Sequence, residues 1–193
     1  MLCARFAHNS AMTTEIEAIS AQLMELKEKL NQLRAEAPPE KVEDFTFETP
    51  SGPVKLSELF GDQSELLLIH NMGASCNYCT LWADGFSGYL RHFRERAAFV
   101  LVSPDTPENQ AKLAAARDWK FRMVQDASRD FSTAMGYWSE KDGWWPGVSA
   151  FHKDAEGTIW RTGKDVFGPG DDYCMVWPAF SLLKGGQNGW EPH

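Results

Sequence analysis

The 193-residue sequence lacks several features, and each absence excludes a class of protein. No segment approaches the roughly 18 consecutive apolar residues that a membrane-spanning helix requires. Lys and Arg total 19 against 27 Asp and Glu, and the basic residues do not cluster as phosphate binding requires. The first residues are too polar for a signal peptide. We therefore expect a cytoplasmic protein that binds neither a membrane nor nucleic acid.

Cysteine is also scarce. The four cysteines are Cys3, Cys76, Cys79 and Cys174, too few and too scattered for a disulfide framework. Cys76 and Cys79 are only three residues apart. In a reducing cytosol, a close pair of this kind is typical of a redox or metal-binding site rather than a structural bridge.

Residues 13–37 form the clearest predicted helix, after a predicted disordered tail at residues 1–12. Thr14-Glu15-Ile16-Glu17 matches a capping box, and Pro38-Pro39 ends the helix. Apolar side chains recur at alternating steps of three and four, as in the seam of a coiled coil. These heptad residues are Ile16, Ile19, Leu23, Leu26, Leu30 and Leu33. The narrow stripe favours pairing with a second copy in a homodimer; the alternative is a helix packed on its own domain.

Residues 39–193 alternate between strand and helix patterns and form the predicted main domain. Three buried strands, 66–69, 98–102 and 121–125, alternate with helices at 80–96 and 108–119. The remaining predicted elements are short strands at 45–49 and 54–56, helical turns at 57–60 and 128–135, a hairpin at 148–161 and a helix at 171–183 interrupted by Pro178. This order predicts a mixed sheet, largely parallel, with helices on both faces.

The cysteine pair follows the first of the buried strands. Cys76 and Cys79 come at the point where a polar, glycine-containing loop gives way to a helix. This position is the carboxyl edge of the sheet, where open α/β folds hold their sites. A cysteine at a helix N-terminus meets backbone N–H groups that favour the thiolate.

The order of elements resembles the thioredoxin fold, in the variant with an N-terminal hairpin that occurs in peroxiredoxins. Residues 45–61 are similar to the entry segment of that variant, and residues 123–136 to its third strand and short helix. The resemblance implies an α/β, thioredoxin-like mixed sheet flanked by helices, here preceded by the heptad helix.

Three motifs resemble a bacterial thioredoxin-like family, domain-of-unknown-function family 899. They are Cys76-x-x-Cys79, Ala83-Asp84-Gly85-Phe86 and the strand Val148-Ser149-Ala150-Phe151. The resemblance covers residues 39–193. Membership implies the fold but no settled activity.

Two features depart from relatives of known chemistry. Peroxiredoxins carry Pro and then Thr or Ser at fixed distances before their reactive cysteine. At those two distances before Cys76, this sequence has Ile69 and Gly73. At the same distances before Cys79, it has Met72 and Cys76. Thioredoxins place a cis-proline before the strand that faces the cysteine pair. Here Pro146 is close, but Val148 falls at that position. The sequence thus predicts no peroxidase of the usual type.

Our functional prediction is a thiol-disulfide oxidoreductase. Cys76, exposed at the helix start, is the predicted nucleophile, and Cys79, one turn further and more buried, resolves the mixed disulfide. Tyr78 lies between them and tunes their environment. We expect no bound organic cofactor, a thiol or disulfide substrate, and a thioredoxin or glutathione system as the reductant.

Two alternatives stay open at this stage. Cys76, Cys79 and Cys174 could bind zinc or an iron-sulfur cluster, although a structural zinc normally takes four ligands. The domain could also be a binding module whose cysteine pair performs no chemistry. Cys174 by itself is typical of a buried small apolar residue.

Two further polar residues are candidates for supporting roles. His70 could lower the pKa of the nearby thiol or shuttle a proton, or it could simply be a hydrogen-bonded histidine at a strand end. Asp84 could relay the proton of Cys79, or could shape the helix together with Gly85. The aromatic run from Tyr137 to Trp145 indicates core or interface packing, with a binding groove as the alternative.

Overall fold

The computed structural model describes residues 11–193, with side chains from Thr14 onward. The chain divides into two compact units, one ending at Pro38 and one spanning Pro39–His193. Within the described residues, no helix combines the length and the apolar character needed to cross a bilayer.

The first unit contains one helix, α1 (Ala11–Glu36). Most of the predicted tail, residues 1–10, lies outside the described residues. The predicted start at a Thr14 cap is wrong, because the helix already includes Ala11 and places Thr14 in its interior. Ala11 and Met12 are good helix formers, so a local capping pattern did not stop the helix from extending past it. The heptad residues are all exposed on the described helix, from Leu30 at 45% to Leu26 at 63%.

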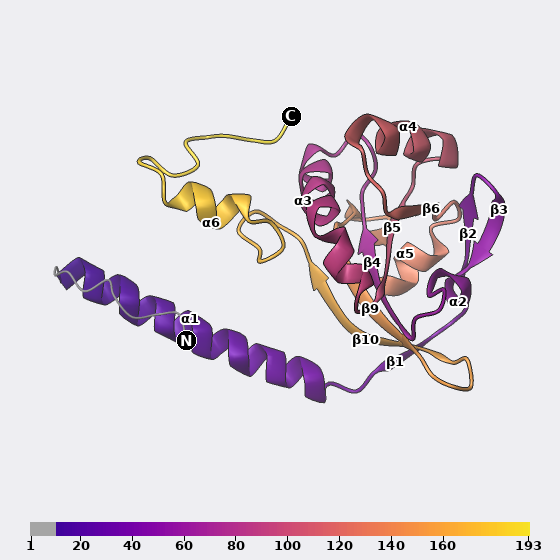
Figure 1. Cartoon of the computed structure of the whole chain (residues 1–193), viewed down its shortest axis with the longest axis horizontal. Helices are drawn as coiled ribbons and strands as arrows, with labels where there is room; N and C mark the ends of the chain where they lie inside the picture. The colour runs from indigo at the N-terminus through magenta and orange to yellow at the C-terminus, as the bar shows by residue number, and fades with distance from the viewer. Residues whose placement is uncertain (1–10) are drawn as a thin grey trace. The chain divides into compact units, whose positions relative to one another are not determined.

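The second unit is built on one eight-stranded sheet, in the order β1-β10-β9-β4-β5-β6-β2-β3 (Figure 1). The strands are β1 (Glu40–Val42), β2 (Thr46–Thr49), β3 (Gly52–Lys55), β4 (Glu65–His70), β5 (Ala98–Ser103), β6 (Arg122–Gln125), β9 (Gly147–Lys153) and β10 (Ile159–Val166). β4, β5 and β6 run parallel, and every other pairing is antiparallel. The predicted mixed sheet is therefore confirmed.

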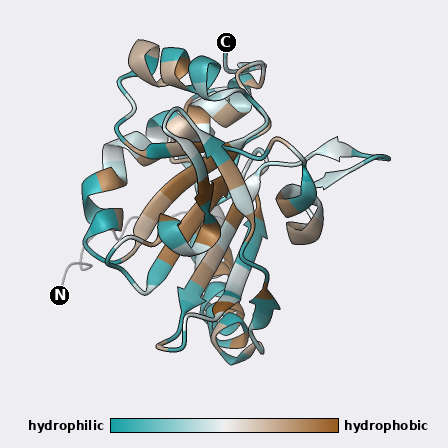
Figure 2. Cartoon of the chain, turned by 90° about the vertical axis from the view of Figure 1, so that its right-hand side faces the viewer, coloured by the Kyte–Doolittle hydropathy of each residue, from teal (hydrophilic) through white to brown (hydrophobic). Residues whose placement is uncertain are grey.

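β4 lies at the centre of the sheet, between β5 and β9. Its register pairs His70 with Val102 on β5 and with Gly147 on β9. Its apolar run is buried on both sides, as expected for a strand covered by helices. Figure 2 shows the apolar residues concentrated on these central strands.

Helices cover both faces of the sheet. On one face, α3 (Asn77–Arg94) packs Trp82, Phe86 and Leu90 in one cluster with Ile69 and Leu101, and α4 (Pro107–Arg117) packs at its margin. On the other face, α2 (Leu56–Leu59) and α5 (Asp130–Met135) pack in a cluster with Leu66, Leu68 and Phe151. Alternate residues of β4 thus serve opposite cores, because successive strand side chains point to opposite faces.

Two segments differ from the sequence prediction. The helix predicted at 171–183 is shorter in the structure, where only α6 (Val176–Ser181) is helical. Before α6 the chain forms a turn, because Oδ1 of Asp171 accepts hydrogen bonds from the backbone N–H groups of Tyr173 and Cys174. Pro178 does not interrupt α6; it lies in the first turn, where a missing N–H costs nothing. The aromatic loop contains a small hairpin, β7 (Trp138–Ser139) with β8 (Gly143–Trp144).

Candidate active site

The loop between β4 and α3 is held by its own side chains. Asn71 continues the strand pairing, with its N–H donating to Val102 O at 2.9 Å. Its side-chain Oδ1 accepts from the N–H of Gly73 at 2.7 Å, which turns the chain sharply. Gly73 has a φ of +106°, a conformation open to glycine at little cost. The turn brings the chain back so that α3 starts directly beside the end of β4.

Asp105 fixes the same loop from the neighbouring β5–α4 connection. Its Oδ2 accepts from the N–H of Ala74 at 2.9 Å and from Ser103 Oγ at 3.2 Å. A Cβ added at Gly73 would lie 3.2 Å from Asp105 Oδ1, so the two loops are closely packed. Sequence reasoning missed Asn71, Gly73 and Asp105 as supporting residues. Their positions at the carboxyl ends of two parallel strands were the available signal.

Cys76 is the N-cap residue of α3. Its backbone is extended, with φ -93° and ψ 102°, and its Sγ accepts a hydrogen bond from the N–H of Cys79 at 3.0 Å. Its carbonyl accepts the first helical bonds, from the N–H of Thr80 at 3.0 Å and from Thr80 Oγ1 at 3.2 Å. The sulfur therefore occupies the place that a serine or aspartate oxygen takes in an ordinary cap.

The two thiols have opposite acidities. The pKa of Cys76 falls to about 7, chiefly because the Cys79 thiol donates a hydrogen bond to it, with help from the backbone N–H groups of Cys79 and Tyr78 and against the effect of burial. The pKa of Cys79 is raised strongly, because its proton is engaged by Cys76 and because it is buried. Near neutral pH a large share of Cys76 is therefore thiolate, whereas Cys79 keeps its proton.

Exposure follows the same asymmetry. Cys76 is half-buried, whereas Cys79 is only 3% exposed. Sγ of Cys79 accepts from the N–H of Met72 at 3.4 Å, which ties it to the loop before the helix. Both cysteines are free thiols here. An approaching electrophile can reach Cys76, while Cys79 lies behind it.

Tyr78, between the two cysteines, is half-buried among tryptophans. Its ring centroid lies 6.2 Å from that of Trp82 and 6.1 Å from that of Trp177. The cysteine pair is thus flanked by a largely buried aromatic cluster that joins α3 to α6. Sequence reasoning placed Tyr78 at the site but did not predict Trp177, which comes from a distant part of the chain.

His70 does not lie beside the thiols. It is buried on the α2–α5 face of the sheet, stacked 3.7 Å from the ring of Tyr137, with its Nε2 3.0 Å from Ser149 Oγ. α3 packs on the opposite face, because His70 shares the orientation of Leu68 and not of Ile69. Burial, with nearby Arg161, holds the pKa of His70 well below its usual value. The proposed thiol-activating role is wrong, and the hydrogen-bonded histidine at a strand end is what the structure contains.

Asp84 is engaged at the other side of α3. Its carboxylate accepts from Trp119 Nε1 at 2.8 Å and from Arg117 at 3.0 Å. These bonds join the middle of α3 to the end of α4. Neither partner is a cysteine, and this geometry favours the helix-positioning alternative over a proton relay.

Pro146 and Val148 flank the end of β9. Gly147 is paired with His70 and Val148 with Ile69, so Val148 packs at the margin of the α3-side core. The carbonyl of Pro146 accepts from the N–H of Phe167 at 2.9 Å. No peptide bond among the described residues is cis. Val148, rather than a cis-proline, thus stands next to the strand that leads to the cysteines.

Cys174 lies in the turn before α6 and is 6% exposed, as expected for a buried small residue. Burial, together with Asp171, raises its pKa. The described residues contain no group of three or more His, Cys, Asp or Glu side chains placed to hold a metal ion. The metal-binding alternative therefore has no support from the described side chains.

The sequence matches the model of the family described as "bacterial protein of unknown function (DUF899)" over residues 5–186. The chain belongs to this family. No functionally curated protein matches it. The family prediction is confirmed over nearly the whole chain.

Peroxiredoxins are among the solved structures with a similar fold. Peroxidoxin BcpB from Mycobacterium tuberculosis is 26% identical with a TM-score of 0.52, over 63% of this chain and 80% of that one. Reduced Prx3 from Vibrio vulnificus is 17% identical with a TM-score of 0.54, over 70% and 89%. PrxQ from Xylella fastidiosa is 16% identical with a TM-score of 0.54, over 66% and 86%. The DUF899 chain therefore has a thioredoxin-like fold of the peroxiredoxin type, as predicted.

Proposed function

We propose that this DUF899 protein is a thiol-disulfide oxidoreductase whose reactive group is the Cys76 thiolate. One observation carries the proposal: Cys76 caps α3 with its sulfur, and the Cys79 thiol donates to that sulfur. A thiolate near neutral pH is the nucleophile of disulfide exchange. Similarity to the peroxidoxin BcpB supports redox chemistry on this fold.

The two cysteines divide the reaction between them. The Cys76 thiolate attacks one sulfur of a substrate disulfide, forming a mixed disulfide and releasing the first substrate thiolate, which takes up a proton. Cys79 then loses its proton and attacks Cys76, forming the Cys76–Cys79 disulfide and releasing the second thiol. The substrate gains two electrons and two protons, and a dithiol reductant of the thioredoxin or glutathione type restores the pair.

Cys79 can resolve the intermediate only after its acidity changes. While the Cys76 thiolate is present, the Cys79 proton is retained in the shared hydrogen bond. Forming the mixed disulfide removes the negative charge on Cys76. Cys79 then no longer donates to a thiolate, so its pKa falls and it can lose its proton. We infer that the second step is thereby timed to follow the first, since the thiolate moves from Cys76 to Cys79 only when substrate is attached.

A thiol peroxidase is the second candidate, and the peroxiredoxin neighbours favour it. In that case Cys76 would attack a peroxide oxygen, forming a sulfenic acid and releasing water or an alcohol. Cys79 would then condense with the sulfenic acid to the same disulfide and release water. The absence of the usual Pro and Thr before Cys76 argues for disulfide exchange over this alternative.

Redox titration with mass-spectrometric detection of alkylated thiols tests the proposal. We expect Cys76 and Cys79 to interconvert as one two-electron couple across a series of glutathione potentials. Peroxide-driven sulfenic acid on Cys76, at rates that exceed disulfide exchange, would favour the peroxidase. If no Cys76–Cys79 disulfide forms at any potential, the oxidoreductase proposal fails and a non-catalytic binding module remains.

We also propose that the protein acts in the cytoplasm as a homodimer paired through α1. The heptad residues form an exposed apolar row on a helix of 26 residues, long enough for a short coiled coil. Sedimentation velocity should show a dimer that Leu23→Glu together with Leu30→Glu converts to a monomer. The matched exchange Gln22→Glu with Gln32→Glu, outside the seam, should leave the dimer intact.

A further inference from the structure

The most buried residue of α4 is polar. Gln110 is 2% exposed, at a position where a helix packed on a sheet normally buries an apolar side chain. Its Nε2 donates to the carbonyl of Val124 at 2.8 Å and to Ser103 Oγ at 3.0 Å. A carbonyl can only accept, so the amide nitrogen must face Val124, and both of its protons are engaged. Gln110 therefore has a fixed orientation and directs one donor at Ser103.

The buried Ser103 hydroxyl, at the end of β5, passes this orientation on. Its oxygen accepts from Gln110 Nε2 and also from the backbone N–H of Asp105 at 3.3 Å. These two donors occupy the lone pairs of the hydroxyl, so its own proton must point to an acceptor. Oδ2 of Asp105 lies 3.2 Å away and accepts it. The serine thus donates to the carboxylate in a direction that the glutamine determines.

The Asp105 carboxylate carries the contact to the loop before the cysteines. Oδ2 also accepts from the N–H of Ala74 at 2.9 Å, and both carboxylate oxygens lie 3.2 to 3.3 Å from the place a Cβ would take at Gly73. The N–H of Cys76 in turn donates to the carbonyl of Gly73 at 3.1 Å. A continuous hydrogen-bonded path therefore leads from α4 to the backbone of the reactive cysteine.

The position of this loop affects how well both sulfurs are hydrogen-bonded. Sγ of Cys76 accepts from the N–H of Cys79 at 3.0 Å, and the N–H of Tyr78 also lowers the pKa of Cys76. Met72, in the same loop, donates its N–H to Cys79 Sγ at 3.4 Å. Among the described residues, no charged side chain contributes to the lowered pKa of Cys76. Because hydrogen bonds weaken steeply as their angles depart from linear, a displaced loop would weaken these contacts.

We propose that Gln110 is a positioning residue for the reactive cysteine. Through Ser103 and Asp105 it fixes the loop that holds the Cys76 sulfur at the first turn of α3. We call the three side chains of Gln110, Ser103 and Asp105 the Gln110 relay. The inference rests on the proposed oxidoreductase function, since disulfide exchange requires a correctly placed thiolate, but its test uses alkylation and needs no turnover.

The test measures the pKa of Cys76 in the full-length reduced protein, from the rate of iodoacetamide addition between pH 5 and 10 resolved by mass spectrometry. Three relay variants interrupt the path. Gln110→Met keeps the length of the side chain and removes both donors, Ser103→Ala removes the hydroxyl, and Asp105→Ala removes the carboxylate. We expect each to raise the pKa of Cys76 by roughly half a unit or more, because two or three backbone N–H bonds lower a carboxylate pKa by about two units and these variants loosen a part of such a set.

A conservative variant distinguishes the hydrogen bonds of the relay from its charge. Asp105→Asn removes the negative charge but keeps an oxygen that can accept from Ala74 and Ser103. The pKa of Cys76 should therefore stay within about 0.3 unit of the unaltered protein, in contrast to Asp105→Ala.

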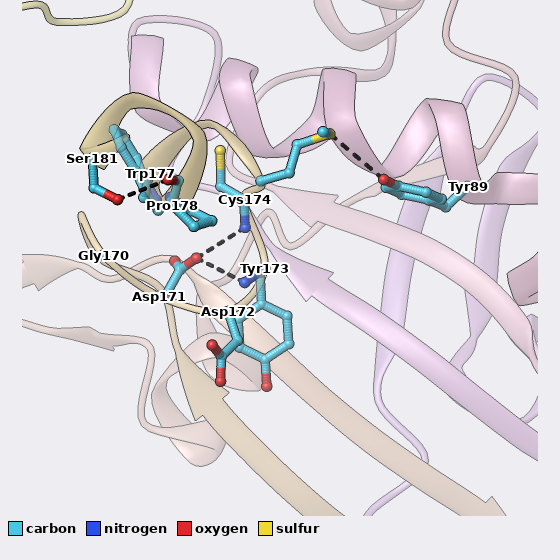
Figure 3. Close-up of a pocket in the computed structure, with 10 residues that line it drawn as sticks. Tyr89, Gly170, Asp171, Asp172, Tyr173, Cys174, Trp177, Pro178 and Ser181 are labelled. Carbon is cyan, nitrogen blue, oxygen red and sulfur yellow. Dashed lines mark hydrogen bonds between the residues drawn. The ribbon is translucent and has the colours of Figure 1, made fainter. Parts of the chain in front are cut away.

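Two control variants remove hydroxyls that lie outside the relay. Ser149→Ala removes a fully buried hydroxyl, 3.0 Å from His70 Nε2 on the face of the sheet opposite α3. Tyr89→Phe removes the hydroxyl that donates to Met175 Sδ at 3.6 Å, further along α3 (Figure 3). Neither should move the pKa of Cys76 by more than about 0.3 unit, although the first should lower the free energy of unfolding.

The outcomes separate positioning from general loss of stability and from the proposed chemistry. A rise confined to the three relay variants would support the role of Gln110. The role is overturned if these variants titrate like the unaltered protein, if a control variant shows an equal rise, or if Asp105→Asn matches Asp105→Ala. Where circular dichroism shows that Gln110→Met or Ser103→Ala does not fold, the half-buried Asp105 decides the question. If redox titration yields no disulfide between the paired cysteines, the proposed function fails, whereas the alkylation series still decides the role of Gln110.

Discussion

The acidity of Cys76 depends on the Cys79 thiol, and removing that thiol gives the sharpest test of the site. The Cys79 side chain is the largest influence on a pKa that falls from 9.0 to about 7. At pH 7, a thiol with a pKa of 9.0 is about 1% ionised, and one with a pKa of 7 about 50% ionised. The lower basicity costs nucleophilicity, about 8-fold for two pKa units at a Brønsted coefficient near 0.45. The net gain in alkylation rate over an ordinary thiol is therefore about 6-fold at pH 7.

Cys79→Ala removes the donor, and Cys79→Ser replaces it with a hydroxyl of similar reach. We expect the alanine variant to raise the pKa of Cys76 by roughly one unit or more, and the serine variant by less, because a hydroxyl can still donate. The assay is the rate of iodoacetamide addition to Cys76 between pH 5 and 10, resolved from the other cysteines by mass spectrometry. A Cys76 pKa near 9 in the unaltered protein, or identical titration in all three proteins, would refute the reasoning.

Three further tests concern the surroundings of the site. Gly147→Ala should lower the free energy of unfolding by about 3 kcal/mol or prevent folding, because the new Cβ would lie 2.3 Å from Asp165 O and from the Tyr137 ring. The control is Gly163→Ala, whose Cβ would enter open space. In urea unfolding its free energy of unfolding should stay within about 1 kcal/mol of the parent protein. Burial keeps His70 neutral in the folded protein, so the free energy of unfolding should decline as pH falls below about 6.5, by up to about 1.4 kcal/mol per pH unit. Urea unfolding at several pH values measures this decline. A free energy that does not change with pH, or a decline that is equally steep in His70→Phe, would contradict the prediction. Because the pKa of Cys76 is depressed in the folded state, the reduced protein should gain stability from pH 7 to 9 and lose that gain as pH falls through 7. Calorimetry of the reduced protein should show this rise, and calorimetry of Cys76→Ser should not.

Local patterns in the sequence were sufficient for most of the elements. The buried run at 66–69, the break at Gly73 and the cysteine spacing depend on neighbours a few residues apart, and the structure has β4, the loop and α3 there. The two errors at helix ends have local causes as well. At α1 a capping pattern lay inside a longer helix, and before α6 the Asp171 side chain formed a turn in place of helix.

The supporting residues of the site were harder to predict, because their partners are distant in the chain. For His70, the separation of six residues from Cys76 left a place beside the thiols open, but a strand alternates its side chains and this one faces the other core. For Asp84, helical proximity to Cys79 left a proton relay open beside a role in shaping the helix, and in the structure Trp119 and Arg117 bind its carboxylate. In both cases sequence separation was a poor guide to contact.

The sequence alone determined the family, the order of strands and helices, and the placement of Cys76 at a helix start, since each depends on short-range pattern. Tertiary structure decided which groups surround the pair. Asp105 reaches Ala74 across 31 residues, and Trp177 reaches Tyr78 across 99. Such contacts form when separate strands and helices pack on a common sheet, and no periodicity within one segment specifies them. The position of Cys76 at a helix start is therefore foreseeable from sequence, while the aromatic residues that pack beside the pair depend on the folded chain.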